Sequence, residues 1–389
     1  MNLIPNFLKS DLWIACGFIL LAFLVRIPYL SHPQEPVFDE VHYSNFAIRT
    51  SEGENNIDLH PPFLRILFAQ ITKIFANDLP REVKAGAPFG NFPFIPLRLM
   101  TVITGSLLAG IIFLIAKKIY PNNSLVVLSP LLYAFDGALI SYSRLILPEI
   151  YILFFGLVGF LFSLVAIDAE KKSQKLLFLM LAGVFMGVSI SIKWSGLGFL
   201  AAAIILLFYK NKLKLVFPLI LISLLMYILI FSVFFPPSEI IKYSAAMYRA
   251  HSTIPSHPAQ SMPYFWPFGE KSFTLWGNGV DAIKLIPNFA AWAGVFISLL
   301  LSVIFFVRGP GNNHFLLGAF LVNYLPFFAI SRPLFIYHYF AALIFGFLMV
   351  PGTLKFLEEM ITTKKENSFA NYYAALVIIF FLIFTPFIY

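Results

Sequence analysis

The sequence is poor in charge and almost free of cysteine. Charged residues make up 12% of the 389, and the single cysteine, Cys16, lies in the first long apolar run. One cysteine can form neither an intramolecular disulfide nor a cysteine-rich metal site. The 27 lysines and arginines are spread among the loops, although the net charge is +8. This distribution argues against a nucleic-acid partner and suits contact with anionic lipid head groups.

Hydrophobic residues make up 59% of the chain, more than a soluble domain of this size could bury. The apolar runs continue for about 18 to 22 residues without alternation, which indicates membrane-spanning helices and not a barrel. No small-residue cleavage site follows the first run, so we expect a retained helix there. We predict an all-α integral membrane protein with a single domain over residues 1–389. Its spans, about eleven in number, cover roughly 11–30, 95–116, 124–141, 148–167, 176–193, 195–209, 215–235, 288–307, 315–331, 334–351 and 370–388.

The basic residues of the short loops fall on one side of this bundle. By the positive-inside rule that side is cytoplasmic, so the N-terminus is predicted inside and the C-terminus outside. The long hydrophilic loops 31–94 and 236–287 then face outward. Within the first, residues 41–50 and 63–75 have helical amphipathic spacing and are expected to lie in the membrane interface, the second starting after Pro61-Pro62. The basic residues are Lys9, Lys117, Lys118, Lys171, Lys172, Lys175, Lys210, Lys212, Lys214, Arg308, Lys355, Lys364 and Lys365.

An acidic pair, Asp39-Glu40, stands in the first outer loop and is followed by His42. A partly desolvated carboxylate can serve as a general base, because burial and a neighbouring like charge raise its pKa. The alternative is a solvated acidic pair without a catalytic role. His60 precedes two prolines that restrict its backbone and aim the imidazole, although the same turn also occurs in ordinary loops.

Arg98, Arg144 and Lys193 lie at the outer ends of predicted spans. Such cations could hold a lipid phosphate, or they could simply snorkel to the interface. Asp136 lies about eight residues inside the span 124–141, where an acid must be paired or protonated, so a functional role is the default. Glu149 could form an ion pair with Arg144, in either a structural or a functional role.

The second outer loop is rich in proline and aromatic residues between His257 and Trp266. This stretch could form a rigid wall that stacks against a sugar, or it could anchor the loop to the bilayer. His251 and His257 are the only plausible metal pair, and no third ligand lies at metal spacing. Polar residues near the outer end of the tenth span could line a pocket or bond helices together. They are Arg332, Tyr337 and His338.

These motifs resemble those of the protein O-mannosyltransferases, the polyprenyl- (dolichyl-) phosphate-mannose–protein mannosyltransferase family of the GT-C fold. The similar blocks follow the family's order over almost the whole chain. They are Phe38 to Tyr43, Asp58 to Pro62, Arg98-Leu99 with Gly105, Asp136-Gly137 with Ser143-Arg144 and Glu149, Lys193 to Leu197, His257 to Pro267, and Tyr337 to Tyr339. The sequence departs from the family pattern at Glu149, Leu64, Arg65, Ala259 and Tyr264, which suggests a different acceptor or sugar.

The resemblance implies an inverting enzyme that moves mannose from polyprenyl-phosphate-mannose to Ser or Thr hydroxyls of secreted or membrane proteins. Asp39 would be the general base, and Glu40 would position the acceptor. Arg98 and Arg144, with Lys193, would neutralise the donor phosphate. The other residues expected to bind donor or substrate are His60, Asp136, Glu149, His257, Trp266, Arg332, Tyr337 and His338.

The same resemblance implies no metal and no cofactor beyond the lipid-linked donor. It also implies that the chain works close to a translocon, where acceptor proteins emerge. The chain has no room for the lumenal MIR domain of eukaryotic members, so we expect a prokaryotic enzyme. Its location would be the plasma (inner) membrane, with the active site on the outer, periplasmic side.

Two other classes of function fit parts of the sequence. A GT-C transferase that adds aminoarabinose to lipid A shares an acidic first-loop pair and a Pro-Pro turn. The Lys193-Trp194-Ser195-Gly196 block and the His257 to Pro267 block argue against it. A transporter would need broken helices near the bilayer midplane, whereas the polar groups here cluster at the outer boundary.

Overall fold

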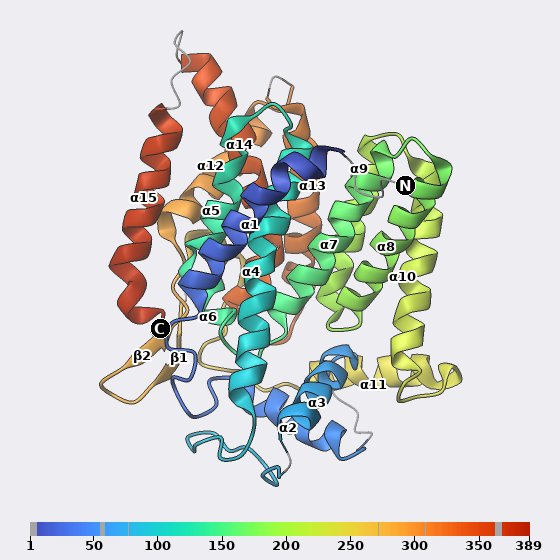
Figure 1. Ribbon diagram of the computed structural model, residues 1–389, viewed down its shortest axis with the longest axis vertical. Coiled ribbons are helices and arrows are strands. Elements are labelled where there is room, and N and C mark those ends of the chain that lie inside the picture. Colours follow the sequence, from blue (N-terminus) through green and yellow to red (C-terminus); the bar gives the residue numbers. More distant parts are fainter. Residues whose placement is uncertain (1–5, 55–58, 77, 271, 308, 362–367) are drawn as a thin grey trace.

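The computed structural model describes residues 6–54, 59–76, 78–270, 272–307, 309–361 and 368–389. Helices that run up and down one bundle make up most of it, and short elements cover the lower end in Figure 1. The predicted residues Asp58, Arg308, Lys364 and Lys365 lie outside the described residues. The long helices are α1 (Asn6–Arg26), α4 (Phe94–Ile119), α7 (Glu149–Asp168), α8 (Lys172–Ile190), α9 (Leu197–Tyr209), α10 (Val216–Phe231), α12 (Phe289–Ile304), α13 (Gly311–Tyr324), α14 (Phe340–Ile361) and α15 (Ser368–Phe384).

Six helical segments among the described residues are long and apolar enough to cross a membrane. They are Phe94–Ile119, Glu149–Asp168, Lys172–Ile190, Leu213–Phe231, Ile336–Ile361 and Phe369–Phe387. Short 3-10 helices extend or join the long ones. These are η1 (Ser124–Val127), η2 (Trp194–Gly196), η3 (Leu213–Leu215), η4 (Pro237–Glu239), η5 (Pro263–Phe268), η6 (Leu325–Ala329), η7 (Ile336–Tyr339) and η8 (Thr385–Phe387). The predicted membrane class is therefore confirmed, while the count of eleven spans stays a prediction.

The predicted span 124–141 is wrong as a single helix. The chain forms α5 (Leu128–Ala134) and α6 (Gly137–Tyr142), and the break lies at Asp136. Asp136 has an extended backbone, and its Oδ1 accepts a hydrogen bond from Leu139 N at 2.9 Å. An aspartate in this position caps the new helix, because its carboxylate satisfies one of the free amides of the first turn.

The two predicted interfacial helices are present as α2 (Glu40–Ser51) and α3 (Phe63–Phe75). Both lie at the lower end of the bundle in Figure 1. α3 buries Leu64 and Phe68, which follow helical spacing, and leaves Ile74 and Phe75 exposed. An exposed apolar end of this kind suits a helix that rests in the interface.

The second long loop contains structure that the sequence did not predict. It holds α11 (Ile240–Ser252) and a two-stranded antiparallel hairpin of β1 (Thr274–Gly277) and β2 (Ala282–Lys284). Thr274 pairs with Lys284, and Trp276 pairs with Ile283. α11 and the hairpin lie at the same end of the bundle as α2 and α3 (Figure 1).

Close approach of helices at glycine holds the bundle together. A Cβ on Gly156 of α7 would lie 2.2 Å from the ring of Phe199 on α9. A Cβ on Gly187 of α8 would lie 2.6 Å from Met226 on α10. Small residues allow this close packing. In a membrane, helices associate mainly through such van der Waals contacts, because the lipid tails are as apolar as the side chains. These contacts join α7 to α9 and α8 to α10; Glu149 is the first residue of α7, and Lys193 follows the end of α8.

Candidate active site

Asp39 of the acidic motif is half-buried at the start of α2. It occupies the N-cap position, yet its side chain makes no capping hydrogen bond to the helix. Burial raises the pKa of the Asp39 carboxyl, and the negative charge of Glu149 raises it further. His42, Lys193 and His257 act in the opposite direction and lower the pKa of this carboxyl. A desolvated carboxyl with a raised pKa is the kind of group that takes a proton from a hydroxyl.

Glu40, the second residue of the motif, is enclosed by protein groups. It is fully buried and forms a salt bridge with Arg98 at 2.6 Å. Its carboxylate also accepts hydrogen bonds from Val37 N at 2.9 Å and Ile146 N at 2.8 Å. This geometry argues against the predicted role of Glu40 in positioning the acceptor, because its carboxylate is buried and bonded to protein partners.

The side chain of Arg98 is also fully buried. Its Nε and Nη2 donate to Glu40, and its remaining donors bind the carbonyls of Leu30, Pro33 and Glu35. A guanidinium has five N–H donors, and these contacts occupy all five. The geometry thus argues against the predicted contact of Arg98 with a donor phosphate.

Arg144 binds backbone instead of an acid. Nε donates to Arg26 O at 3.1 Å, Nη1 to Ile388 O at 3.2 Å, and Nη2 to Pro28 O at 2.6 Å and Tyr29 O at 3.0 Å. The side chain is 3% exposed and fastens the end of α1 to the end of the chain. The predicted pair of Arg144 with Glu149 is wrong, and the geometry likewise argues against a phosphate contact.

Glu149 pairs with Lys193 instead. The Lys193 Nζ lies 3.0 Å from Glu149 Oε1, and both side chains are about nine-tenths buried. Glu149 is the first residue of α7, and Lys193 follows the end of α8 in an extended segment. Nζ also lies 5.4 Å from the ring centre of Tyr337. Lys193 acts electrostatically on Asp39, so this pair belongs to the surroundings of the candidate base.

A large cavity opens beside Lys193. It has a volume of about 930 Å³ and lies between α9, α11, α13 and the segments around His60 and Arg332. Lys193, Arg332 and the histidines gather at its polar end. Much of the remaining wall is apolar and includes Leu197, Ala201, Leu321, Val322, Leu325 and Ile330. Two cations at the head of an apolar cavity match the chemistry of a lipid phosphate.

Burial at this polar end disfavours the charged form of the His60 and His251 imidazoles. Burial lowers the pKa of His60 well below its usual value, and the positive charges of Lys193 and His251 lower it further. Burial lowers the pKa of His251 to about 4, with Arg332 and Lys193 contributing. The His60 and His251 rings lie 5.1 Å apart. Neutral rings can hydrogen-bond a phosphate or sugar without adding charge.

A metal centre is not apparent in this region. Within the described residues, no group of three or more His, Cys, Asp or Glu side chains could hold an ion. His251 lies against His60 and not against His257, so the histidine pair considered from the sequence is not brought together as a site.

Trp266 does not form an open sugar-stacking wall. It is fully buried, its Nε1 donates to Ser261 Oγ at 2.8 Å, and its ring is stacked at 6.2 Å on His338. His338 in turn lines the large cavity and lies 3.5 Å from Arg332 Nη2. Trp266 therefore supports the cavity from behind, while the exposed His257 lies near Asp39.

Asp136 is paired, and its partners are all structural. Besides Leu139 N, its carboxylate accepts hydrogen bonds from Asn288 N at 3.0 Å and Trp292 Nε1 at 2.7 Å. These contacts join the break between α5 and α6 to the start of α12. Asp136 is absent from the lining of the cavity, so the functional role that its depth suggested is not supported.

Asn323 is a cavity residue that the sequence reasoning missed. It lines the large cavity and also a small one of about 30 Å³ that Glu149, Lys193, Tyr337 and His338 share. Its Nδ2 donates to Gly198 O at 3.1 Å and Ala319 O at 2.9 Å. A polar amide inside the apolar span 315–331 was the signal that could have identified it.

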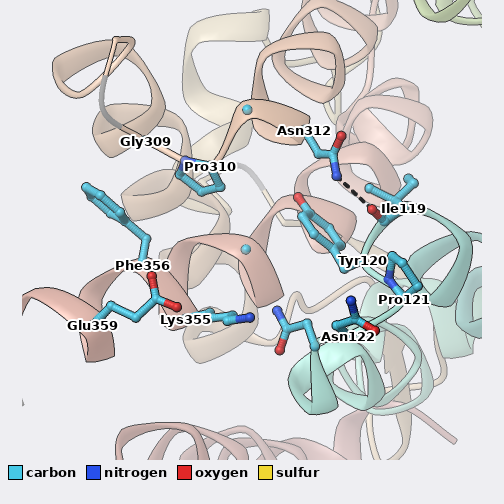
Figure 2. A pocket seen from close by; sticks show the side chains of 13 residues that line it. Ile119, Tyr120, Pro121, Asn122, Gly309, Pro310, Asn312, Lys355, Phe356 and Glu359 are labelled. Atoms are coloured by element: carbon cyan, nitrogen blue, oxygen red, sulfur yellow. Dashed lines mark hydrogen bonds between the residues drawn. The ribbon is translucent and has the colours of Figure 1, made fainter. Parts of the chain in front are cut away.

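A second sizeable cavity, of about 380 Å³ and shown in Figure 2, lies at the end of the bundle where α4 ends and α13 begins. The turn after α4, the start of α13 and the end of α14 surround it. Lys355 and Glu359 line one side, and Asn312 donates from Nδ2 to Ile119 O at 2.7 Å across it. It contains none of the predicted site residues, so we place the candidate site at the end with Asp39.

Solved structures define the fold class of this chain. The Saccharomyces cerevisiae protein O-mannosyltransferase Pmt1-Pmt2 complex, bound to the sugar donor, matches with a TM-score of 0.86 at 14% identity, over 99% of this chain and 91% of that chain. ArnT from Cupriavidus metallidurans, bound to undecaprenyl phosphate, matches with a TM-score of 0.62 at 15% identity, over 96% of this chain and 70% of that chain. The chain has the GT-C fold of membrane glycosyltransferases.

Sequence comparison then gives the family. The profile "Dolichyl-phosphate-mannose-protein mannosyltransferase" matches residues 17–237, and the profile "C-terminal four TMM region of protein-O-mannosyltransferase" matches residues 310–389. The chain belongs to the protein O-mannosyltransferase family. Dolichyl-phosphate-mannose–protein mannosyltransferase 4 of Schizosaccharomyces pombe is 33% identical over 138 residues, which are 35% of this chain and 18% of that relative. The match thus spans less than a fifth of the relative's length.

Proposed function

We propose that this protein transfers mannose from a polyprenyl-phosphate-mannose donor to Ser or Thr hydroxyls of proteins. The reaction takes place at the end of the bundle that holds Asp39, which the distribution of lysines assigns to the outer face of the membrane. The acceptors are secreted or membrane proteins that reach this face. Family membership and the chemistry of the cavity beside Asp39 support this proposal.

The donor occupies the large cavity. Its phosphate lies at the polar end, where Lys193 and Arg332 supply positive charge and the neutral His60 supplies a hydrogen-bonding ring. Its polyprenyl chain lies along the apolar wall formed by α9 and α13. Lys193 and Arg332 thereby replace Arg98 and Arg144 as the phosphate-binding cations, because the latter two are occupied by protein partners.

Asp39 is the general base. As the acceptor oxygen attacks the anomeric carbon, the hydroxyl proton passes to the Asp39 carboxylate, and the bond from that carbon to the phosphate oxygen breaks. The leaving group is the polyprenyl phosphate, whose new negative charge Lys193 and Arg332 stabilise. Attack and departure take place on opposite faces of the sugar, so the configuration at the anomeric carbon inverts.

One observation carries this proposal above the others. Lys193 lines the donor cavity and at the same time acts electrostatically on Asp39. The same side chain therefore connects the base to the place where the phosphate would leave.

The test is transfer by the purified protein. Polyprenyl-phosphate-mannose labelled in the sugar is incubated with a Ser/Thr peptide and with the same peptide in which alanine replaces every Ser and Thr. We expect label on the first peptide alone. Asp39→Asn should lower the rate by about 10²- to 10⁴-fold and leave lipid-phosphate binding intact.

Two results would overturn the proposal. Label found only on a lipid acceptor would instead support a transferase of the aminoarabinose–lipid type. Unchanged turnover in Asp39→Asn would remove the assigned base, whatever the acceptor is.

A further inference from the structure

Phe38, directly before the candidate base, has an unusual backbone. Its φ is 51°, which lies in the left-handed region that glycine adopts readily and other residues rarely do. For a bulky aromatic residue this conformation persists only where the surrounding structure holds it. At the point where the chain enters α2, the direction of the backbone thus depends on what fixes Phe38.

The Phe38 ring is fixed by an aromatic cage, defined here as four rings: two from the second outer loop and two from the segment that leads into α14. Ring centres lie 5.3 Å away for Phe273, 5.9 Å for Phe335, 6.2 Å for His257 and 6.3 Å for Tyr337. Three of the four contacts are edge-to-face, the arrangement that aromatic quadrupoles favour. The cage therefore connects the acidic motif to both the second outer loop and the start of the last-but-one long helix.

The residue on the other side of Asp39 is also held in place. Glu40 accepts from Val37 N and is bonded to Arg98, so the backbone on both sides of Asp39 has fixed anchors. Between these anchors the Asp39 carboxylate makes no capping bond to α2. The carboxylate is therefore not bonded to the amides of the helix, and its position follows from the left-handed turn at Phe38.

We propose that Phe38 is a positioning residue for transfer, because its caged ring maintains the left-handed turn that aims the Asp39 carboxylate at the acceptor hydroxyl. The inference rests on the proposed function for its catalytic consequence. Its structural part, the orientation of Asp39, can be measured without any activity. The cage also contains His257, which acts on Asp39 directly, so the same contact places that exposed imidazole beside the base.

The test compares Phe38→Ala, Phe38→Gly and Phe38→Tyr with the control Phe46→Ala. Phe46 is another partly buried phenylalanine of the same segment, and its ring contact is with Tyr43 of the same helix at 6.1 Å. Phe38→Ala should lower kcat by about 10- to 100-fold with little change in KM for the lipid donor, because a small misplacement of a catalytic group has effects of that size. Phe38→Tyr should retain most of the turnover, since its ring can enter the same cage.

Phe38→Gly separates the effect of the left-handed backbone from the effect of the caged ring. Glycine adopts the left-handed backbone freely but has no ring, so it should be as slow as Phe38→Ala if the cage does the positioning. Wild-type turnover in Phe38→Gly would show that the backbone conformation alone suffices and would overturn the role of the cage.

A second readout does not depend on activity. Modification of Asp39 by a water-soluble carbodiimide and an amine, followed by mass spectrometry, should be faster in Phe38→Ala than in the wild type and unchanged in Phe46→Ala. Equal modification rates in all variants would overturn the proposal. An inactive wild type that still shows this difference in modification would count against the proposed function and leave the positioning of Asp39 supported. Loss of stability in Phe38→Ala with unchanged kcat per folded molecule would reduce Phe38 to a packing residue.

Discussion

Two salt bridges close to Asp39 have the same charges and different surroundings. Glu40 and Arg98 lie 2.6 Å apart with both side chains fully buried, whereas Glu149 and Lys193 lie 3.0 Å apart with side chains 9% and 10% exposed. The guanidinium of Arg98 is surrounded by carbonyls that occupy its remaining donors. Lys193 instead borders two cavities.

The chemistry of arginine and lysine explains why one cation is enclosed by protein groups and the other borders cavities. Arginine presents a planar fork of donors that can be satisfied completely by fixed protein acceptors, and such a group has nothing left for a ligand. Lysine carries a compact charge on a flexible stem, so it can exchange a protein carboxylate for a substrate phosphate. We therefore propose that Glu40–Arg98 belongs to the architecture of the acidic loop and that Glu149–Lys193 belongs to the proposed reaction.

The largest expected effect is on stability, in Arg98→Met. Removal of one partner leaves Glu40 charged and buried, which should lower the free energy of unfolding by about 3–5 kcal/mol. Thermal denaturation in detergent micelles measures this loss. The double variant Glu40→Leu with Arg98→Met should recover part of it, because no unpaired charge remains. If Arg98→Met unfolds like the wild type but no longer binds lipid phosphate, the assignment of the two pairs is reversed.

The second effect is on turnover, in Lys193→Met. Loss of one cation at the leaving phosphate should lower kcat by about 10²- to 10³-fold, since a single preorganised electrostatic contact contributes on that scale. Donor binding should weaken as well. The control is Lys118→Met, which removes a lysine 2.6 Å from Asp168 at the other end of the bundle and should leave turnover unchanged. Equal activity of the two variants would contradict a role of Lys193 in the donor site.

Much of this arrangement could be predicted from the sequence, because the membrane makes local pattern informative. Continuous apolar runs gave the membrane class, and amphipathic spacing located α2 and α3. The motif around Asp39 was singled out by its residue types and its position between apolar runs, and its role as a base followed from the family resemblance. Each of these features depends on neighbours in the sequence, for which periodicity and charge are direct signals.

The partners of charged residues could not be predicted in the same way. Arg98 and Lys193 look alike in the sequence, as cations at the outer ends of spans, and only the fold shows that Glu40 reaches one and Glu149 the other. The break at Asp136 was missed because the run 124–141 stays apolar on both sides of it. Asp136 caps α6 at the break, and its carboxylate also accepts hydrogen bonds from Asn288 and Trp292, about 150 residues further along the chain.

Asp136→Asn should have a smaller effect than either pair, and only on stability. The amide can replace one acceptor but places an NH₂ group against donors, so unfolding should become easier by about 1–3 kcal/mol. Turnover per folded molecule should not change, because this residue lies outside the donor cavity. Asp168→Asn, at an exposed carboxylate paired with Lys118, is the matched control and should change stability by less than about 1 kcal/mol. A loss of turnover in folded Asp136→Asn would return this acid to the functional site.

The smallest effect is a shift of the pH profile in Glu149→Gln. Asp39 must be deprotonated to accept the hydroxyl proton, so kcat/KM rises with pH through its pKa and is constant above it. Burial raises that pKa and Glu149 raises it further, while Lys193 lowers it. Removal of the Glu149 charge leaves burial and the lysine, so the acidic limb of the profile should move to lower pH. Glu239→Gln, which removes a carboxylate that is near Lys242 on the surface, should leave the limb in place. An acidic limb that does not move in Glu149→Gln would mean that Glu149 does not act on Asp39. The proposal that Glu149–Lys193, and not Glu40–Arg98, takes part in the reaction would then lose its support.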